Sequence, residues 1–353
     1  MDYYDLAVEK LNKLKDKKDV IILAIESSCD ETACAITKDR EVLANIIASQ
    51  IEIHKRFGGV VPEIASRNHT LAVKTIVVEA LEKAKLTLDD IDCFAVTYGA
   101  GLLGALLVGV SYAKALAYAT KKPLLAVNHI RGHICANYIA DTTLQPPFAC
   151  LIASGGHTAI SIVKSYEDIE IVGSTQDDAC GEAFDKVARV LGLPYPGGPQ
   201  IEKLAKLGKP SIQMPMPYKN QGHYNFSYSG LKTAVINYVH KKTQNGEEIC
   251  KEDVACSFQE RALDMIVSNA VRACLNYNIK KLAIAGGVGA NQRLKEMVMQ
   301  KAKKNDITVF YPPMILCTDN AVMIASCAFN MLKGNFKPSK LDLDADANLK
   351  IAD

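Results

Sequence analysis

The chain has 353 residues, which is long for one average domain and suits a protein of two lobes. Hydrophobic residues make up 49% and charged residues 23%, an ordinary globular balance with enough apolar material for two cores. The formal net charge of +2 excludes a strongly basic protein that holds RNA by itself, so an RNA substrate would need a local or shared basic surface.

Eleven cysteines, an odd number without a C-x-x-C pair, argue against a disulfide framework and predict a reducing, cytoplasmic location. Residues 1–19 alternate lysines with acids and form neither a signal peptide nor an acid-poor transit peptide. The longest apolar run, from Gly101 to Ala113, is interrupted by glycines and ends at Lys114. It is too short to span a bilayer, so no membrane association is expected.

The first predicted elements form a β-hairpin. Residues 20–25 have the pattern of a buried strand, residues 26–32 form a polar turn, and residues 33–37 form a second strand. Acids and hydroxyls therefore lie at the hairpin tip. Helical periodicity follows over 67–85, and a strand at 93–97 leads through a glycine turn into a helix of small residues.

A proline-containing break near 142–147 is a candidate lobe boundary, and the pattern then restarts. Strands at 148–153 and 159–163 flank a polar, glycine-bearing turn, so a similar hairpin occurs twice. A third unit has a strand at 281–285, a glycine turn and a helix at 290–302. The sequence predicts an α/β protein of two duplicated lobes whose glycine turns face a common cleft.

The sharpest local signal is the pair His129 and His133. Two histidines four residues apart on a helix lie on one face, so both imidazoles can reach one ion. A pair of core or surface histidines without a metal is an equally common outcome of this spacing. The polar neighbours Asn128 and Arg131 favour the metal, and a carboxylate from elsewhere would complete a zinc or non-haem iron site.

The best third ligand is Asp319, which precedes an amphipathic run at 321–332. On spacing alone, the cap of that helix is the more common role for an aspartate at this place. A zinc protease is excluded because its H-E-x-x-H motif needs a glutamate as general base, and Ile130 occupies that position.

Three glycine turns, at Ser154–Gly156, Gly197–Gly198 and Gly286–Gly289, offer backbone N–H groups to a phosphate. None is a Walker A loop, and each alone is typical of a tight turn, but together they indicate a nucleotide in a cleft. Asp178, Glu182 and Asp185 have the spacing of one helix face, suited to ribose hydroxyls or to a solvated edge. Cys180 and Cys317 are expected to be small buried residues.

Nine motifs occur in the order typical of the tRNA N6-threonylcarbamoyladenosine transferase family, which the chain resembles from about residue 20 to about residue 335. They are Ile25 to Thr32, Gly58 to Glu63, Asn128 to His133, Ser154 to Thr158, Gly181 to Lys186, Tyr195 to Pro199, Phe226 to Thr233, Gly286 to Val288 and Cys317 to Asn320. The resemblance implies the two-lobed actin/Hsp70/sugar-kinase-like fold with a nucleotide between duplicated lobes. The expected division is 20–128 plus 318–340 as lobe I and 129–317 as lobe II, with an unassigned extension at 1–19 and a tail at 341–353.

The resemblance also implies residue roles. His129, His133 and Asp319 would bind iron or zinc, and the hairpin-tip acids Asp30 and Glu31 would be catalytic or hold a second cation. Archaeal relatives have a tyrosine ligand where Ile152 stands and an asparagine where His157 stands, so the chain resembles the bacterial branch and its fourth ligand is open. Threonylcarbamoyl-AMP, with Mg²⁺ on the nucleotide, would contact Ile152, Ala153, Ser154, Gly155, Gly156, Asp185, Gly198, Asn291 and the acidic Glu202.

The implied reaction transfers the threonylcarbamoyl group from threonylcarbamoyl-AMP to N6 of adenosine 37 in tRNAs that read ANN codons. Bacterial relatives act with a paralogous TsaB-like subunit and a small TsaE-like ATPase, and both are expected here. A sugar-kinase-like phosphotransferase and a non-catalytic ATP-binding regulator would share the fold. The histidine pair and the nine motifs favour the transferase over these two.

Overall fold

The computed structural model describes residues 2–218 and 221–351, which fall into two compact units. Unit 1 comprises Met1–Gln145, Ser165–Asp168 and Asp319–Asp353, and unit 2 comprises Pro146–Lys164 and Ile169–Thr318. Residues 129–145 thus belong to unit 1, whereas lobe II was expected to begin at residue 129. The reason is packing, because the helix that begins at His129 lies against the helix that follows Asp319.

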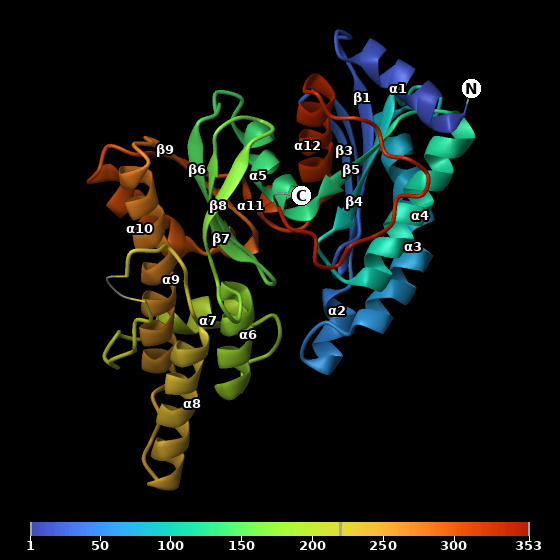
Figure 1. Cartoon of the computed structure of the whole chain (residues 1–353). Coiled ribbons are helices and arrows are strands. Elements are labelled where there is room, and N and C mark those ends of the chain that lie inside the picture. The colour runs from blue at the N-terminus through green and yellow to red at the C-terminus, as the bar shows by residue number, and fades with distance from the viewer. Residues whose placement is uncertain (1, 219–220, 352–353) are drawn as a thin grey trace. The chain divides into compact units, whose positions relative to one another are not determined.

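Unit 1 is a five-stranded mixed sheet with helices on both faces (Figure 1). Its strand β1 is an almost continuous apolar run with five of its six residues buried, as expected for a strand covered on both sides. Helices α3 and α4 cover one face, and α12 with α5 covers the other (Figure 1). The elements are α1 (Tyr3–Leu14), β1 (Ile21–Glu26), β2 (Glu31–Lys38), β3 (Glu41–Ser49), α2 (Ile51–His54), the 3₁₀ turn Lys55–Phe57, α3 (Pro62–Ala84), β4 (Cys93–Gly99), α4 (Leu103–Thr120), β5 (Leu124–Asn128), α5 (His129–Ala140) and α12 (Ala321–Lys333).

Unit 2 repeats this plan with different helices. Its core fills the space between a second five-stranded sheet and α6 and α9, where Phe184 and Phe258 pack edge to face with ring centroids 5.0 Å apart. The elements are β6 (Phe148–Ala153), β7 (Thr158–Val163), β8 (Ile169–Ser174), α6 (Cys180–Val190), α7 (Gly197–Ala205), α8 (Ser229–Gln244), α9 (Lys251–Asn276), β9 (Lys281–Ala285), the 3₁₀ turn Gly287–Ala290, α10 (Gln292–Lys303), β10 (Thr308–Phe310) and α11 (Met314–Cys317).

The two sheets have the same topology. Unit 1 has the order β3-β2-β1-β4-β5 and unit 2 the order β10-β9-β6-β7-β8. In each, the first three strands along the chain form an antiparallel meander. The fourth strand pairs in parallel with the first, and the fifth pairs in parallel with the fourth. The predicted duplication of an α/β unit is therefore confirmed, and β1–β2 and β6–β7 are equivalent hairpins.

Two further sequence expectations are wrong. The apolar run was expected to be too short to span a bilayer, but it lies in α4, which continues to Thr120 and is long and apolar enough to cross a bilayer by length and composition. A core helix passes the same test, and α4 buries Ala105, Leu106 and Val110 inside unit 1. Asp178 lies before α6 rather than on its face, since the helix begins at Cys180.

The extension at 1–19, which the sequence left unassigned, contains α1 and packs on unit 1. Ala7, Leu11 and Leu14 are buried on one face of this helix. Its C-terminal end is held by Lys333, whose ammonium donates to the carbonyls of Lys15 and Lys17 at 2.7 and 2.8 Å. The extension is thus a structural part of unit 1.

Candidate functional site

The predicted histidine pair begins a helix at the carboxyl end of the parallel sheet in unit 1. Strand β5 ends at Asn128, whose side-chain oxygen caps α5 by accepting from the N–H groups of Ile130 and Arg131 at 2.9 and 3.2 Å. His129 and His133 therefore stand one turn apart, with ring centroids 4.6 Å apart. The predicted placement of both imidazoles on one helix face is confirmed.

Asp319, which is distant in the sequence, lies beside both histidines. Its oxygen Oδ1 lies 3.1 Å from Nε2 of His133 and 3.5 Å from Nε2 of His129. The cap of α12 is not Asp319 but Asn320, whose side chain accepts from the N–H of Met323 at 3.0 Å. The carboxylate of Asp319 thus lies against the histidines, and the next residue caps the helix.

These three residues fit a metal ion by their geometry and their chemistry. One ligand atom from each lies within 4.8 Å of the others, and among the described residues no other group of this kind was found. His133 is buried, and neither of its ring nitrogens makes a hydrogen bond to a described residue, in spite of the close approach of Asp319. A buried imidazole whose nitrogens make no hydrogen bond is costly, and coordination through Nε2 would remove part of that cost. Two imidazoles and a carboxylate are a donor set typical of zinc and non-haem iron.

A buried carboxylate that the sequence analysis missed lies behind His129. Glu26 ends β1, is fully buried, and holds Oε2 at 3.2 Å from Nδ1 of His129. Burial raises the pKa of Glu26, but the charge and hydrogen bond of His129 outweigh it and lower that pKa overall. Burial lowers the pKa of His129, but Asp319 and Glu26 raise it to about 9. The sequence feature that could have pointed to Glu26 is its place as the one charged residue at the end of an otherwise apolar strand.

The hairpin-tip acids lie at the same end of unit 1. Asp30 is buried, and Oε1 of Glu31 accepts from the hydroxyl of Ser49 at 3.1 Å. Burial raises the pKa of Glu31 to about 10, and the negative charges of Asp30 and Asp319 act in the same direction. Glu31 therefore keeps its proton at neutral pH and can donate a hydrogen bond.

In unit 2 the first glycine turn is held in shape by its own polar groups. Strand β6 ends at Ala153, the N–H of Ser154 donates to the carbonyl of His157 at 2.8 Å, and the N–H of His157 donates to Oγ of Ser154 at 3.1 Å. A Cβ added at Gly155 or Gly156 would meet no described atom within 4 Å, so this backbone is open. Ile152 and Ala153 are fully buried strand residues, so neither side chain is exposed.

Two glycines from other segments of unit 2 pack against this turn. Gly286 adjoins the end of β6, because a Cβ added there would lie 2.4 Å from the carbonyl oxygen of Ala153. The start of α6 approaches equally closely, since a Cβ on Gly181 would lie 2.7 Å from the carbonyl oxygen of Ser154. Glycine is required at both points by close backbone contact.

Asp185, Asn291 and Glu202 bind protein groups in this structure. Oδ1 of Asp185 accepts from the N–H of Gly197 at 2.6 Å, next to Gly198, where an added Cβ would meet no described atom within 4 Å. Asn291 caps α10 by accepting from the N–H of Leu294 at 3.0 Å. Its amide also donates to Gln259, a buried residue that the sequence analysis missed, at 3.0 Å. Oε1 of Glu202 accepts from the N–H of Gln292 at 3.2 Å.

Asp178 has a role other than the one expected from helical spacing. Its two carboxylate oxygens pair with Lys186 and Lys232, each at 2.6 Å. The neighbouring Asp177 accepts from the hydroxyl of Ser227 at 2.5 Å and from the N–H of Tyr228 at 2.7 Å. These acids attach α8 to the start of α6. Cys180 and Cys317 are buried, as predicted.

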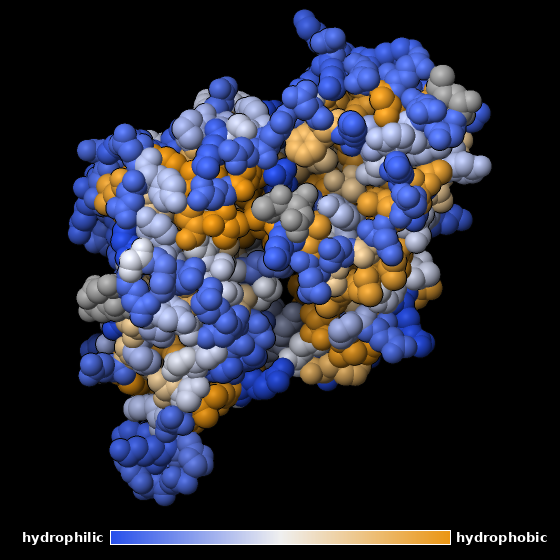
Figure 2. Space-filling view, viewed as in Figure 1, coloured by the Kyte–Doolittle hydropathy of each residue, from blue (hydrophilic) through white to orange (hydrophobic). Residues whose placement is uncertain are grey.

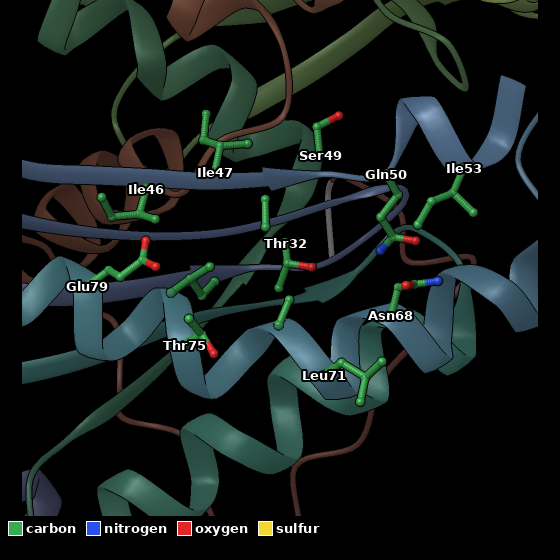
Figure 3. Close-up of a pocket in the computed structure, with 13 residues that line it drawn as sticks. Thr32, Ile46, Ile47, Ser49, Gln50, Ile53, Asn68, Leu71, Thr75 and Glu79 are labelled. Carbon is green, nitrogen blue, oxygen red and sulfur yellow. The ribbon is translucent and has the colours of Figure 1, made fainter.

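A separate pocket of about 340 Å³ lies between β3 and α3 in unit 1 (Figure 3). Gln50 and Asn68 face it from one end, and Leu71 lies on the α3 side (Figure 3). None of the predicted site residues lines it. It is therefore not the site described above.

Comparison with known proteins gives one consistent result. A family model described as tRNA N6-adenosine threonylcarbamoyltransferase matches residues 41–326. A protein of that name from Clostridium botulinum (strain Kyoto / Type A2) is 54% identical over 340 residues, which is 96% of this chain and 99% of the relative. One from Clostridium novyi (strain NT) is 55% identical and covers 95% of this chain and 99% of its own length.

Solved structures share the fold at low sequence identity. Full-length HypF, in a phosphate- and nucleotide-bound form, aligns with a TM-score of 0.63 at 15% identity and covers 90% of this chain and 47% of its own. HypF from T. kodakarensis also aligns with a TM-score of 0.63, at 14% identity, and covers 90% of this chain and 48% of its own. At this identity the likeness shows the fold alone.

Proposed function

The chain belongs to the tRNA N6-adenosine threonylcarbamoyltransferase family, and from this premise we propose how its residues carry out the transfer. The reaction attaches a threonylcarbamoyl group to N6 of adenosine 37 in tRNAs that read ANN codons, forming t6A. The family match along nearly the whole chain does not favour a sugar-kinase-like phosphotransferase or a non-catalytic regulator. The observation that carries the site assignment is the convergence of His129, His133 and Asp319.

The family implies a metal ion, and these three residues would hold it through Nε2 of each imidazole and a carboxylate oxygen. The donor set suits iron or zinc. When bound, the ion supplies Lewis acidity and a template for the substrate oxygens. The protein contributes the fixed orientation of the ligands, since the capped start of α5 and the capped start of α12 set both backbones.

Threonylcarbamoyl-AMP would bind unit 2 through backbone and side chains. The open amides of Gly155 and Gly156 would donate to its anionic groups, with Ile152, Ala153 and Ser154 supplying the adjoining backbone. Asp185 would accept from ribose hydroxyls. Mg²⁺ would accompany the nucleotide. Gly198, Asn291 and Glu202 would make the remaining contacts with threonylcarbamoyl-AMP.

Proton transfer is assigned to the hairpin tip of unit 1. The N6 amine attacks the carbamoyl carbonyl, AMP leaves with the electron pair of the broken bond, and N6 gives up one proton. Asp30 is the candidate base for that proton. Glu31, protonated at neutral pH because its pKa is raised to about 10, would donate a hydrogen bond to developing negative charge.

A paralogous TsaB-like subunit and a TsaE-like ATPase are the proposed partners. Helices α3 and α4 pack together and leave large apolar side chains exposed, and Figure 2 shows hydrophobic atoms on the surface over these helices. They are Leu71, Val78, Leu103, Leu107 and Tyr118. This face suits a helical partner subunit. All eleven cysteines are free thiols, which supports a reducing cytoplasm as the location.

The test is mass spectrometry of tRNA nucleosides after the protein is depleted from its host. We expect t6A to fall, and to return when the wild type or a His240→Ala control is supplied, because His240 is exposed on α8. The His133→Ala variant should fail to restore it. An unchanged t6A level after depletion would refute the function, and full restoration by His133→Ala would refute the site.

A further inference from the structure

The carboxylate of Glu26 is held by two donors that belong to neighbouring parts of unit 1. The N–H of Ser28 donates to Oε1 at 2.5 Å, and the hydroxyl of Thr97 donates to Oε2 at 2.5 Å. Ile25 pairs with Val96 in the parallel ladder of β1 and β4, so Glu26 and Thr97 occupy adjacent places at the carboxyl ends of these strands. The side chain therefore has a fixed position although it is charged and fully buried.

One ring nitrogen of His129, Nδ1, faces the carboxylate of Glu26, and the other, Nε2, faces Asp319. Nδ1 lies 3.2 Å from Oε2 of Glu26 and 3.0 Å from Oγ of Ser28, while Nε2 lies 3.5 Å from Asp319. An ionised carboxylate accepts hydrogen bonds and cannot donate, so a stable contact with it requires the proton on Nδ1. In the neutral ring, that tautomer leaves the lone pair on Nε2, the nitrogen that faces Asp319.

His133 has no such support. Its Nδ1 makes no hydrogen bond to any residue that the structure describes. The two imidazoles are thus unequal: the ring of His129 is oriented by a carboxylate and that of His133 is not. Carboxylate support of a ligating histidine is a common device for fixing its tautomer and raising its basicity.

We infer that Glu26 is a positioning residue for the metal site: it fixes the ring of His129 with Nε2 as the ligating nitrogen. The inference rests on the proposed metal-binding role of His129, His133 and Asp319. It assigns Glu26 no contact with the substrate or the ion.

A glutamine in place of Glu26 cannot do the same. The N–H of Ser28 can only donate, so the amide oxygen of the substituted side chain would have to face it, and the NH₂ group would face Thr97 and His129. Thr97 can rotate its hydroxyl to accept. His129 can accept only by moving its proton from Nδ1 to Nε2, which removes the lone pair from the ligating nitrogen.

The experiment measures the Zn²⁺ affinity of metal-stripped protein by competition with a chelator. Glu26→Gln should weaken binding about 10- to 100-fold, the usual cost of removing a group that supports a ligand. The matched control is Ser27→Ala, a buried neighbour whose hydroxyl donates to the carbonyl of Ala105 at 3.0 Å, and it should bind as the wild type does. Thr97→Val removes one hydrogen bond from Glu26 and keeps its charge, so a smaller loss is expected.

A double-mutant cycle separates positioning from general support of the fold. In a His129→Ala background, Glu26→Gln should cause no further loss of Zn²⁺ affinity, because its effect passes through the missing ring. An equal loss in both backgrounds would overturn the inference, as would unchanged affinity of a folded Glu26→Gln variant in the wild-type background. Should Glu26→Gln fail to fold, Thr97→Val takes its place in the cycle. A loss of Zn²⁺ affinity that disappears in the His129→Ala background would support the inference, and an equal loss in both backgrounds would overturn it.

A spectroscopic readout is independent of affinity. In Zn²⁺-saturated protein with ¹⁵N-labelled histidine, the His129 signals, assigned by their loss in His129→Ala, should show a protonated Nδ1 and a metal-bound Nε2. The reverse pattern in the wild type would overturn the inference. If His129→Ala and His133→Ala leave Zn²⁺ binding intact, the proposed metal site itself is refuted, and that result is distinct from a failure of Glu26 alone.

Discussion

The equivalent hairpins of the two units share a topology and differ in chemistry. The tip of β1–β2 in unit 1 carries buried acids and hydroxyls, among them Glu26, Ser28 and Asp30. The tip of β6–β7 in unit 2 carries Gly155 and Gly156, whose backbone is open. One hairpin presents buried polar side chains and the other an open main chain, so the duplicated fold carries two tips of different chemistry.

This difference predicts opposite sensitivities to mutation. At the tip of unit 1, removing a side chain leaves buried partners unsatisfied, because charges there are paired with one another. At the tip of unit 2, adding a side chain blocks the approach of a ligand, because no described atom of the protein occupies that space. Substitutions in both units, taken from the largest expected effect to the smallest, test this contrast.

The largest effect is expected from removing both histidines of unit 1. His129→Ala/His133→Ala should lose the bound transition-metal ion, which elemental analysis should find at about one per chain in the wild type. The binding of adenylate analogues, measured by calorimetry, should not change, because its proposed residues lie in unit 2. Full metal content in the double variant would contradict the assignment, and peptidase activity in the wild type would contradict the family function.

In unit 2, Asp185→Ala should weaken the binding of an adenylate analogue about 10- to 150-fold, which corresponds to about 1.5–3 kcal/mol for a charged hydrogen bond. Part of the loss will come from the N–H of Gly197, which loses its acceptor. The control is Glu182→Ala on the same helix, where the carboxylate pairs with Lys186 at 2.8 Å and is half exposed. Equal affinity of Asp185→Ala and the wild type would remove Asp185 from the site.

Two glycines of unit 2 should separate binding from stability. Gly155→Ala meets no neighbour, so the free energy of unfolding should stay within about 0.5 kcal/mol of the wild type while nucleotide affinity falls. Gly286→Ala should lower the free energy of unfolding by about 1–3 kcal/mol, because φ is +89° and the new Cβ would lie 2.4 Å from a carbonyl oxygen. Chemical denaturation with parallel calorimetry measures both quantities. Unchanged affinity in Gly155→Ala would argue against backbone binding at this turn.

The smallest effect concerns Glu31 and pH. Its pKa is about 10 in the folded protein against 4.5 as the ordinary value, so between these values the folded state binds more protons than the unfolded state. The stability that this group contributes therefore falls as pH rises through that window. Glu31→Gln removes the dependence and should raise the Tm relative to the wild type more at mildly alkaline than at mildly acidic pH.

The measurement is differential scanning calorimetry of metal-free protein. The shift should be a few degrees at most, since relaxation and water reduce the effect of burial. Glu52→Gln serves as control, because that side chain is exposed on α2. A Tm difference that is independent of pH would mean that Glu31 is ionised in the folded protein.

The sequence by itself determined the local features of this protein. The spacing of His129 and His133 fixes both rings on one face because helical hydrogen bonding repeats at 3.6 residues per turn. The apolar run of β1, the glycines of both turns and the repeated hairpin could be read in the same way, since strand burial and turn geometry depend on a few adjacent residues. The motifs then identified the family.

The tertiary structure decided which distant residues meet. The parallel alignment of β1, β4 and β5 places Glu26 and Thr97 beside His129, and no spacing along the chain shows that contact. The packing of α12 on α5 brings Asp319 to the histidines and leaves the helix cap to Asn320. Helical periodicity placed Asp178 on α6, but that helix begins at Cys180 and Asp178 pairs with lysines instead. Long-range pairing depends on strand order and helix packing, which are properties of the whole fold rather than of any short segment.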